Sequence, residues 1–178
     1  MAKRGQTSSV GGFVTGIALR DRIKKWLQDS GLYTSSNTPP GMSFMVQGRY
    51  PRAATIGSQP LNFFVIQQED DNSLISIVSN IVFNDQHKLA FSALEEAKRR
   101  EIMTDIQRTL WFRCGFSLQQ DEKTKEILGI QLSQIIFMDP VEPLSKNALL
   151  HEIERLYRGY MFISWKLQEV VSPAALEQ

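Results

Sequence analysis

Two histidines and one cysteine are the only side chains in this sequence that offer the nitrogen and sulfur donors of a typical zinc site. His151 begins a His-Glu-x-x pattern on a predicted helix, but Arg155 stands where a metalloprotease carries its second histidine, one helical turn later. Because this leaves too few ligands for zinc, we expect His151 to lie on a polar helix face. The sequence predicts no metal and no cofactor.

Cys114 and His87 are the one thiol and the one nearby base that could form a nucleophilic pair. They lie near the two ends of a predicted helix over residues 85–113, about 40 Å apart at a rise of about 1.5 Å per residue. A continuous helix would keep them separate. We therefore expect Cys114 to be a buried, unreactive side chain.

Two other patterns fall short of ligand sites. The glycine-rich stretch over residues 11–16 precedes a helix, but it lacks a preceding strand and the lysine of a phosphate-binding loop. Asp70 begins a sequence that resembles a calcium loop until Leu74, which stands where an oxygen ligand belongs. We interpret both as ordinary connecting segments.

Nucleic-acid binding has two candidate features. Phe63 and Phe64 place aromatic rings on a predicted central strand, as RNA-stacking platforms do, but neighbouring strand residues point to opposite faces and core packing is favoured. The 20 basic and 19 acidic residues leave a net charge of +1, so only a local patch could bind phosphates. Arg20, Lys24 and Lys25, together with the N-terminal tail, are the candidates for that patch.

The last predicted helix carries aromatic side chains on the face opposite its apolar seam. At 100° per residue, Phe162 and Trp165 fall beside Arg158, and Met161 borders the same side. Either another element of the chain covers these aromatics, or they form a contact patch of the kind enriched in interfaces. Arg158, Met161, Phe162 and Trp165 are therefore the predicted partner or dimer surface.

The elements that must position these residues follow from periodicity. Apolar residues at helical spacing predict helices over Gly16–Ser30, over residues 85–113 and along a last seam from Leu149 to Val171. Alternating or continuously apolar runs predict five strands, which are Met42–Tyr50, Leu61–Gln68, Ser73–Phe83, Phe116–Gln120 and Ile127–Met138. Residues Thr34–Gly41 are expected to be a connector. The fold class is α+β, a two-layer sandwich with a mostly antiparallel five-stranded sheet and three helices in the order α-β-β-β-α-β-β-α.

Composition and length indicate a single domain. With 42% hydrophobic and 22% charged residues, the chain has the make-up of an ordinary globular domain. We place this domain at residues 16–171, between a flexible N-terminal tail, 1–15, and a C-terminal tail, 172–178. A single cysteine excludes an internal disulfide, and the sequence shows neither a secretory signal nor a stretch of the length that crosses a membrane. A cytoplasmic location is therefore expected.

The order of elements resembles the fold of type III secretion chaperones and of several uncharacterised prokaryotic families that share it. The residues that carry the resemblance lie in Leu19–Leu27, in the three strands Met42–Tyr50, Leu61–Gln68 and Ser73–Phe83, in the helix over 85–113, in the hairpin Phe116–Met138 and in the seam Leu149–Val171. Proteins of this kind are commonly homodimers that bind a partner polypeptide and need no cofactor. The resemblance therefore implies a binding role.

The sequence thus favours a non-enzymatic protein-binding module, chaperone-like or an adaptor, that acts as a homodimer on a protein partner. Nucleic-acid binding through the first helix and the tail is the alternative, although nucleic acid and membrane are not the expected partners. An enzyme that carries no recognisable motif is the other alternative. Salt dependence separates the first two hypotheses, because phosphate binding weakens steeply as salt rises.

Overall fold

A computed structural model of the chain describes residues 16–51, 60–111, 113–124, 126–139 and 143–171. The predicted tails, 1–15 and 172–178, lie outside the described residues. The elements in chain order are α1 (Gly16–Asp29), β1 (Tyr33–Asn37), β2 (Met42–Tyr50), β3 (Leu61–Gln68), β4 (Leu74–Val82), α2 (Asp85–Ala93), α3 (Glu96–Leu110), β5 (Gly115–Gln120), β6 (Ile127–Phe137) and α4 (Lys146–Val171).

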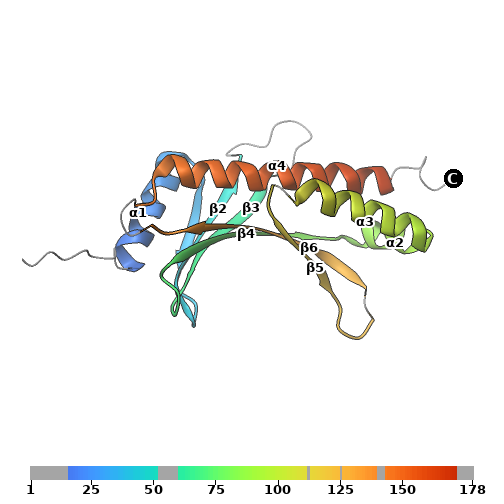
Figure 1. Cartoon of the computed structure of the whole chain (residues 1–178), viewed down its shortest axis with the longest axis horizontal. Helices are drawn as coiled ribbons and strands as arrows, with labels where there is room; N and C mark the ends of the chain where they lie inside the picture. Colours follow the sequence, from blue (N-terminus) through green and yellow to red (C-terminus); the bar gives the residue numbers. More distant parts are fainter. Residues whose placement is uncertain (1–15, 52–59, 112, 125, 140–142, 172–178) are drawn as a thin grey trace, which may run out of the picture.

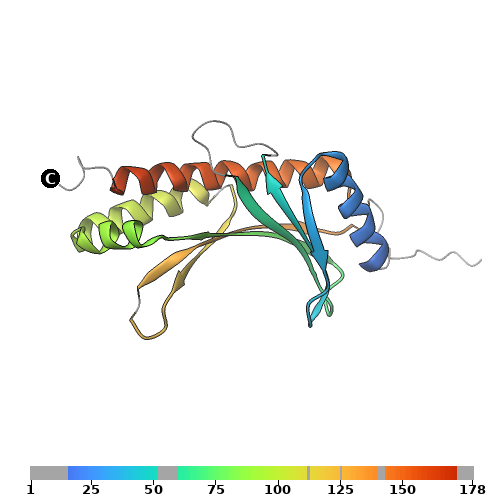
Figure 2. The ribbon, with the colours of Figure 1, turned by 180° about the vertical axis from the view of Figure 1, so that it is seen from behind.

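The strands form one antiparallel sheet in the order β1-β2-β3-β4-β6-β5. The helix α4 runs along one face of this sheet. The helices α2 and α3 lie beside the C-terminal half of α4, and α1 packs at the β1–β2 end of the sheet (Figure 1). The opposite view shows the same arrangement, with no described helix on the other face of the sheet (Figure 2). The α+β class and the antiparallel sheet are therefore confirmed.

The number of elements was predicted wrongly, because the described chain has six strands and four helices rather than five and three. Residues Tyr33–Asn37 form β1, an edge strand paired with β2, and all but Tyr33 lie in the segment expected to be a connector. This strand is short and polar, with Ser35 donating a side-chain hydrogen bond to Gln47 over 3.0 Å. Without apolar alternation, its strand character does not show in the periodicity.

The predicted helix over 85–113 is in fact two helices. Leu94, at the C-cap of α2, and Glu95, at the N-cap of α3, both have extended backbone with ψ of 146° and 147°. Just before the break, the Ser92 hydroxyl donates to the Leu89 carbonyl over 2.9 Å, and such a local bond competes with the helical ladder. Because of the break, α2 and α3 can take different directions, and each buries its own apolar residues, Phe91 on α2 and Ile106 on α3.

Hydrogen bonds define one end of each of three helices. Gly31 has a φ of 69°, and Leu32 donates its backbone N–H to the carbonyl of Leu27 over 2.8 Å, which is a Schellman ending of α1. Asn84 caps α2 by accepting from the His87 amide over 2.8 Å. The Ser145 hydroxyl accepts from the Ala148 amide over 3.1 Å at the start of α4.

The core lies between the sheet and the helices that cover one of its faces. The seam of α4 buries Leu149, Ile153, Leu156, Ile163 and Leu167, as predicted, while Tyr160 is only partly buried and the side chain of Val171 is outside the described set. Among the described residues, no helix has both the length and the apolar character that a membrane crossing requires.

Candidate partner-binding surfaces

The uncovered face of the sheet carries a strip of mainly apolar side chains, which we call the open-face strip. It consists of Met45, Phe64, Ile66, Leu74, Ser76, Val78, Ile135 and Phe137. The register places these residues side by side, because Met45 is opposite Ile66, and Phe64 is opposite Val78. Ser76 lies opposite Ile135 on the next strand. The strip therefore crosses four strands, with Ser76 as its one polar member.

Exposure increases towards the β6 side of this strip. Phe64 and Val78 are half-buried, since neighbouring side chains on the sheet cover one another. Ile135 is 54% exposed and Phe137 is 79% exposed. Burying a large apolar side chain is worth about 1.5–3 kcal/mol, so the described monomer leaves a substantial gain unrealised on this face.

Amide side chains border the open-face strip. Asn80 accepts hydrogen bonds from Gln119 and Gln131, each over 3.2 Å. Arg49, the single charged residue on this face of the described strands, donates to Asn62 over 3.3 Å. The border satisfies its own polar groups and adds little charge, so the face favours apolar over ionic contacts.

The predicted surface on α4 is divided by the fold. Phe162 packs partly against the core, whereas Met161 is 38% and Trp165 is 52% exposed. Arg158 is exposed and forms an ion pair with Glu154 over 2.6 Å. The two aromatic rings are neighbours, with centroids 6.1 Å apart. Intrachain cover thus accounts for much of Phe162 but leaves half of Trp165 in solvent.

Lys166 links this aromatic pair to α3. Its Nζ lies 4.8 Å from the centroid of the Trp165 ring and 2.8 Å from a carboxylate oxygen of Asp105. The hydrogen bond to Asp105 raises the pKa of the Lys166 ammonium above its ordinary value. This ion pair holds the outer face of α4 against α3, because Lys166 is on α4 and Asp105 is on α3.

The basic residues of the nucleic-acid alternative are on α1 but do not form a free cluster. Arg20 pairs with Asp21 over 3.0 Å. Lys24 lies over the ring of Tyr33, with Nζ 5.6 Å from the centroid, and Lys25 is exposed. Two of the three cations therefore already have partners within the chain.

The candidate catalytic residues do not come together. His87 is in the first turn of α2 and Cys114 follows α3, so the rest of α2 and all of α3 lie between them in the chain. Burial raises the pKa of the Cys114 thiol to about 11, although Arg155 and Arg113 act in the opposite direction. Cys114 is buried, as predicted, and a thiol with this pKa is protonated at neutral pH.

Metal chemistry has no site among the residues that the structure describes, since no three His, Cys, Asp or Glu side chains gather there. His151 is exposed on α4. The pKa of His87 is below its ordinary value because burial disfavours the imidazolium, and its Nδ1 has no hydrogen-bond partner. A solitary imidazole of this kind carries no recognisable reaction.

The open-face strip is the surface that sequence reasoning missed. Two strands, Leu61–Gln68 and Ser73–Phe83, are apolar on both faces, a pattern that predicts a central position in the sheet. They are central, yet helices cover only one face of the sheet (Figure 1). The signal was present, because the predicted helices, each with a single apolar stripe, supply one covering layer and not two.

Comparison with known proteins identifies a family and a fold. The family described as "Uncharacterized conserved protein (DUF2299)" matches residues 19–167. The crystal structure of an uncharacterized protein from Methanothermobacter thermautotrophicus superposes with a TM-score of 0.72 at 23% identity, covering 86% of this chain and 99% of that chain. YbjN from E. coli superposes with a TM-score of 0.47 at 10% identity, covering 84% and 89%. No curated protein shows significant sequence similarity to the chain.

Proposed function

The chain belongs to the DUF2299 family of uncharacterised conserved proteins, and we propose that it is a non-enzymatic module that binds another protein, with a chaperone-like or adaptor role. The observation that supports this proposal is the open-face strip. An uncovered apolar surface that continues across four strands is typical of an interaction site.

The shape and chemistry of the open face favour an amphipathic helix as the occupant. The β3–β4 turn and the β5–β6 hairpin both bend away from the helices, so the open face is curved inwards (Figure 1). The backbone groups of β2, β3, β4 and β6 already pair with neighbouring strands. A partner must therefore bind through side chains, as a helix does when it lays its apolar face into a groove.

Capture from the source cell with three baits tests this proposal. The test variant is Ile135→Asn/Phe137→Asn, and the matched control is Leu89→Asn, which alters a side chain that is 71% exposed on α2. All three positions are largely solvent-exposed, so each substitution should change the free energy of unfolding by less than about 0.5 kcal/mol per site.

We expect wild type and the Leu89 variant to retain the same protein at low and high salt, because apolar contacts persist as ionic strength rises. The strip variant should lose it, and the purified partner should bind the purified chain with the same pattern. Retention by all three baits would contradict the proposal. So would loss of the partner from wild type at high salt, which indicates ionic docking.

We also propose that the module is a homodimer that uses the exposed part of the α4 surface, Met161 and Trp165. A two-fold contact brings the same patch of each copy together. The patch places Lys166 beside Glu169, with 3.4 Å between their charged atoms. Lys166 is thus neutralised within its own chain by Asp105 and Glu169, so the exposed aromatics of two copies can meet without charge repulsion.

A further inference from the structure

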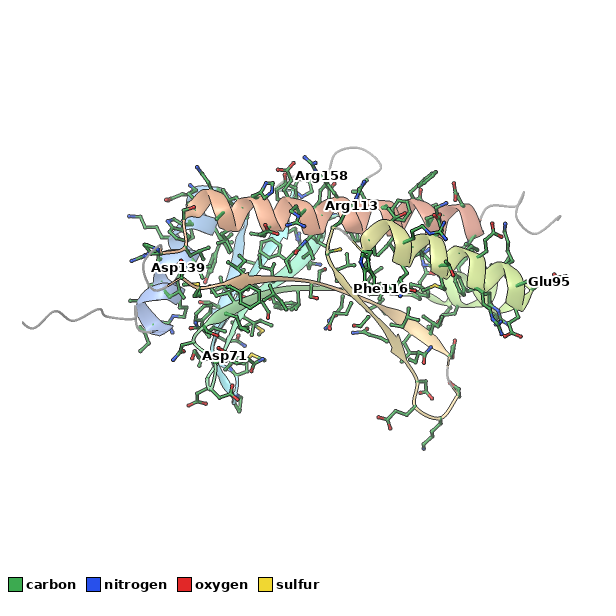
Figure 3. The ribbon with its side chains drawn as sticks, viewed as in Figure 1. Asp71, Glu95, Arg113, Phe116, Asp139 and Arg158 are labelled. Carbon is green, nitrogen blue, oxygen red and sulfur yellow. The ribbon has the colours of Figure 1, made fainter. Side chains whose placement is uncertain are left out.

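A pocket with no carboxylate in its lining lies where α3 ends beside α4. It has a volume of about 440 Å³, and its apolar floor includes Leu110, Cys114 and Phe116. Phe116 lies opposite the fully buried Leu132 on β6, so the pocket opens on the helix-covered side of the sheet, away from the open-face strip. Figure 3 shows Arg113 at this end of α3, close to α4, with Phe116 on the strand that follows.

Trp111 stands between this pocket and a second hollow of about 300 Å³ lined by Thr104, Gln107, Arg108 and Trp111 itself. Its side chain is 72% exposed, although its backbone is fixed by an N–H bond to the Gln107 carbonyl over 2.9 Å. An exposed tryptophan on a fixed backbone is the kind of residue that dominates binding energy at interfaces.

Three guanidinium groups surround Trp111, and none of the residues lining the two hollows is acidic. Arg108 and Arg113 form no ion pair with any described residue, while Arg155 pairs with Glu152 over 3.0 Å. The carbonyls at the C-terminal end of α3 attract Arg108. They account for neither the exposed ring of Trp111 nor the position of Arg113.

We propose that this site, which we call the Trp111 pocket, binds an acidic peptide segment in which carboxylates flank a large apolar side chain. Arg108 and Arg113 would each receive a carboxylate, since guanidinium and carboxylate match as bidentate pairs. The apolar side chain would pack on Trp111 and on the floor formed by Leu110 and Phe116. Arginine clusters recognise acidic motifs in this way.

The charge around the pocket favours a short acidic segment over a nucleic acid. A single strand needs a positive groove that follows its backbone over several nucleotides. One turn before Arg108, α3 carries Asp105, and Glu101 lies one further turn back. Asp105 and Glu101 are already paired with Lys166 and Lys98, and residues 101–107 of α3 hold no cation that could continue a phosphate groove. A peptide, by contrast, can end its acidic run at the pocket.

Fluorescence anisotropy with defined probes tests the proposal on the full chain. The probe is a short fluorescein-labelled peptide of Asp and Glu around a central Leu-Phe. Its matched analogue has Asn and Gln in place of the acids, and a labelled oligothymidylate is the nucleic-acid probe. The test variant is Arg108→Gln/Arg113→Gln, and the control is Arg99→Gln/Arg100→Gln, which removes the same charge from the other end of α3.

We expect the acidic peptide to bind wild type and the control variant alike, and to bind the test variant about tenfold more weakly. The amide analogue should bind wild type about tenfold more weakly than the acidic peptide, and Trp111→Ala should also weaken the acidic peptide. Circular dichroism should show the same melting temperature for wild type and both arginine variants, since the exchanged groups are largely at the surface.

Three results would overturn the proposal. Equal losses in the test and control variants would mean general charge attraction. Oligothymidylate that binds more tightly than the acidic peptide, and is lost in the test variant, would assign the pocket to nucleic acid. A dimer of the unliganded chain that the test variant dissociates would show that a second copy, with its acidic turn at Glu69–Asp71, is the occupant. These results leave the open-face proposal untouched, because its variants lie on the other face of the sheet.

Discussion

The ring of Phe63 lies directly against Gly48, its cross-strand neighbour on the adjacent strand of the sheet. Phe63 on β3 is fully buried, and a Cβ atom at position 48 of β2 would come within 2.8 Å of Cε2 of that ring. Real Cβ atoms do not approach other atoms so closely. The lack of a side chain at Gly48 therefore leaves space for the ring of Phe63 in the core. The next residue, Phe64, points to the open face of the sheet.

Replacing Gly48 by Ala should lower the free energy of unfolding by about 1–3 kcal/mol, because the added methyl group forces the buried ring or the backbone to move. The smaller backbone entropy of alanine offsets only part of this loss. Urea unfolding measures the change. In a Phe63→Leu background the same substitution should cost less, and an equal cost in both backgrounds would refute the contact.

Replacing Leu156 by Ala should cost about 2–5 kcal/mol, since this side chain is fully buried at the centre of the α4 seam. Leu89→Ala, on an exposed position of α2, is the matched control and should change the free energy of unfolding by less than about 0.5 kcal/mol. A loss below about 0.5 kcal/mol for Leu156→Ala would mean that another face of α4 lies on the sheet.

The thiol of Cys114 should make stability depend on pH in alkaline solution. Burial raises its pKa to about 11 in the native state, against about 8.5 in the unfolded chain. Between these values the native state holds a proton that the unfolded state has released, so the free energy of unfolding falls as pH rises. Wild type should lose on the order of 3 kcal/mol more than Cys114→Ala across this window.

Urea unfolding of both proteins at several pH values measures this difference, and the other titrating groups cancel in the comparison. Below about pH 8.5 the free energies of unfolding of wild type and Cys114→Ala should change with pH in parallel, because the thiol is protonated in both the native and the unfolded state. Parallel curves up to about pH 11 would show that the native pKa of Cys114 is ordinary.

Much of the fold could be predicted from the sequence, because strong periodic patterns mark long elements. The seam of α4 and the alternation of β2 each extend over several turns or residues, and burial follows them. Polar β1 could not be predicted in this way, since its strand character comes from pairing with β2 rather than from a buried face. The break at Leu94 could not be predicted either, because no Gly or Pro interrupts the sequence there.

The candidate surfaces show the same limit more sharply. Periodicity finds the aromatics on the outer side of α4, because a helix has one core-facing stripe. The periodicity of a strand cannot show that Phe64 lacks a covering layer. A strand that is apolar on both faces has the same sequence pattern whether one or two layers cover the sheet. The position of Arg108, Arg113 and Arg155 around Trp111 depends on how α3, β5 and α4 meet, which no local pattern encodes.

The homodimer proposed for α4 should depend on Trp165. Static light scattering on wild type should give twice the monomer mass, and Met161→Asp/Trp165→Asp should give the monomer mass. Desolvating these introduced carboxylates in a two-fold contact would be costly. Both side chains are exposed in the monomer, so the variant should keep the circular dichroism spectrum of wild type, with a melting temperature lowered only by the loss of the dimer contact. Phe162 is left unchanged because it packs against the core.

The control for this dimer test is Leu89→Asp on α2, which should remain dimeric. A monomeric wild type, or a variant that remains dimeric, would remove this face of α4 from the assembly.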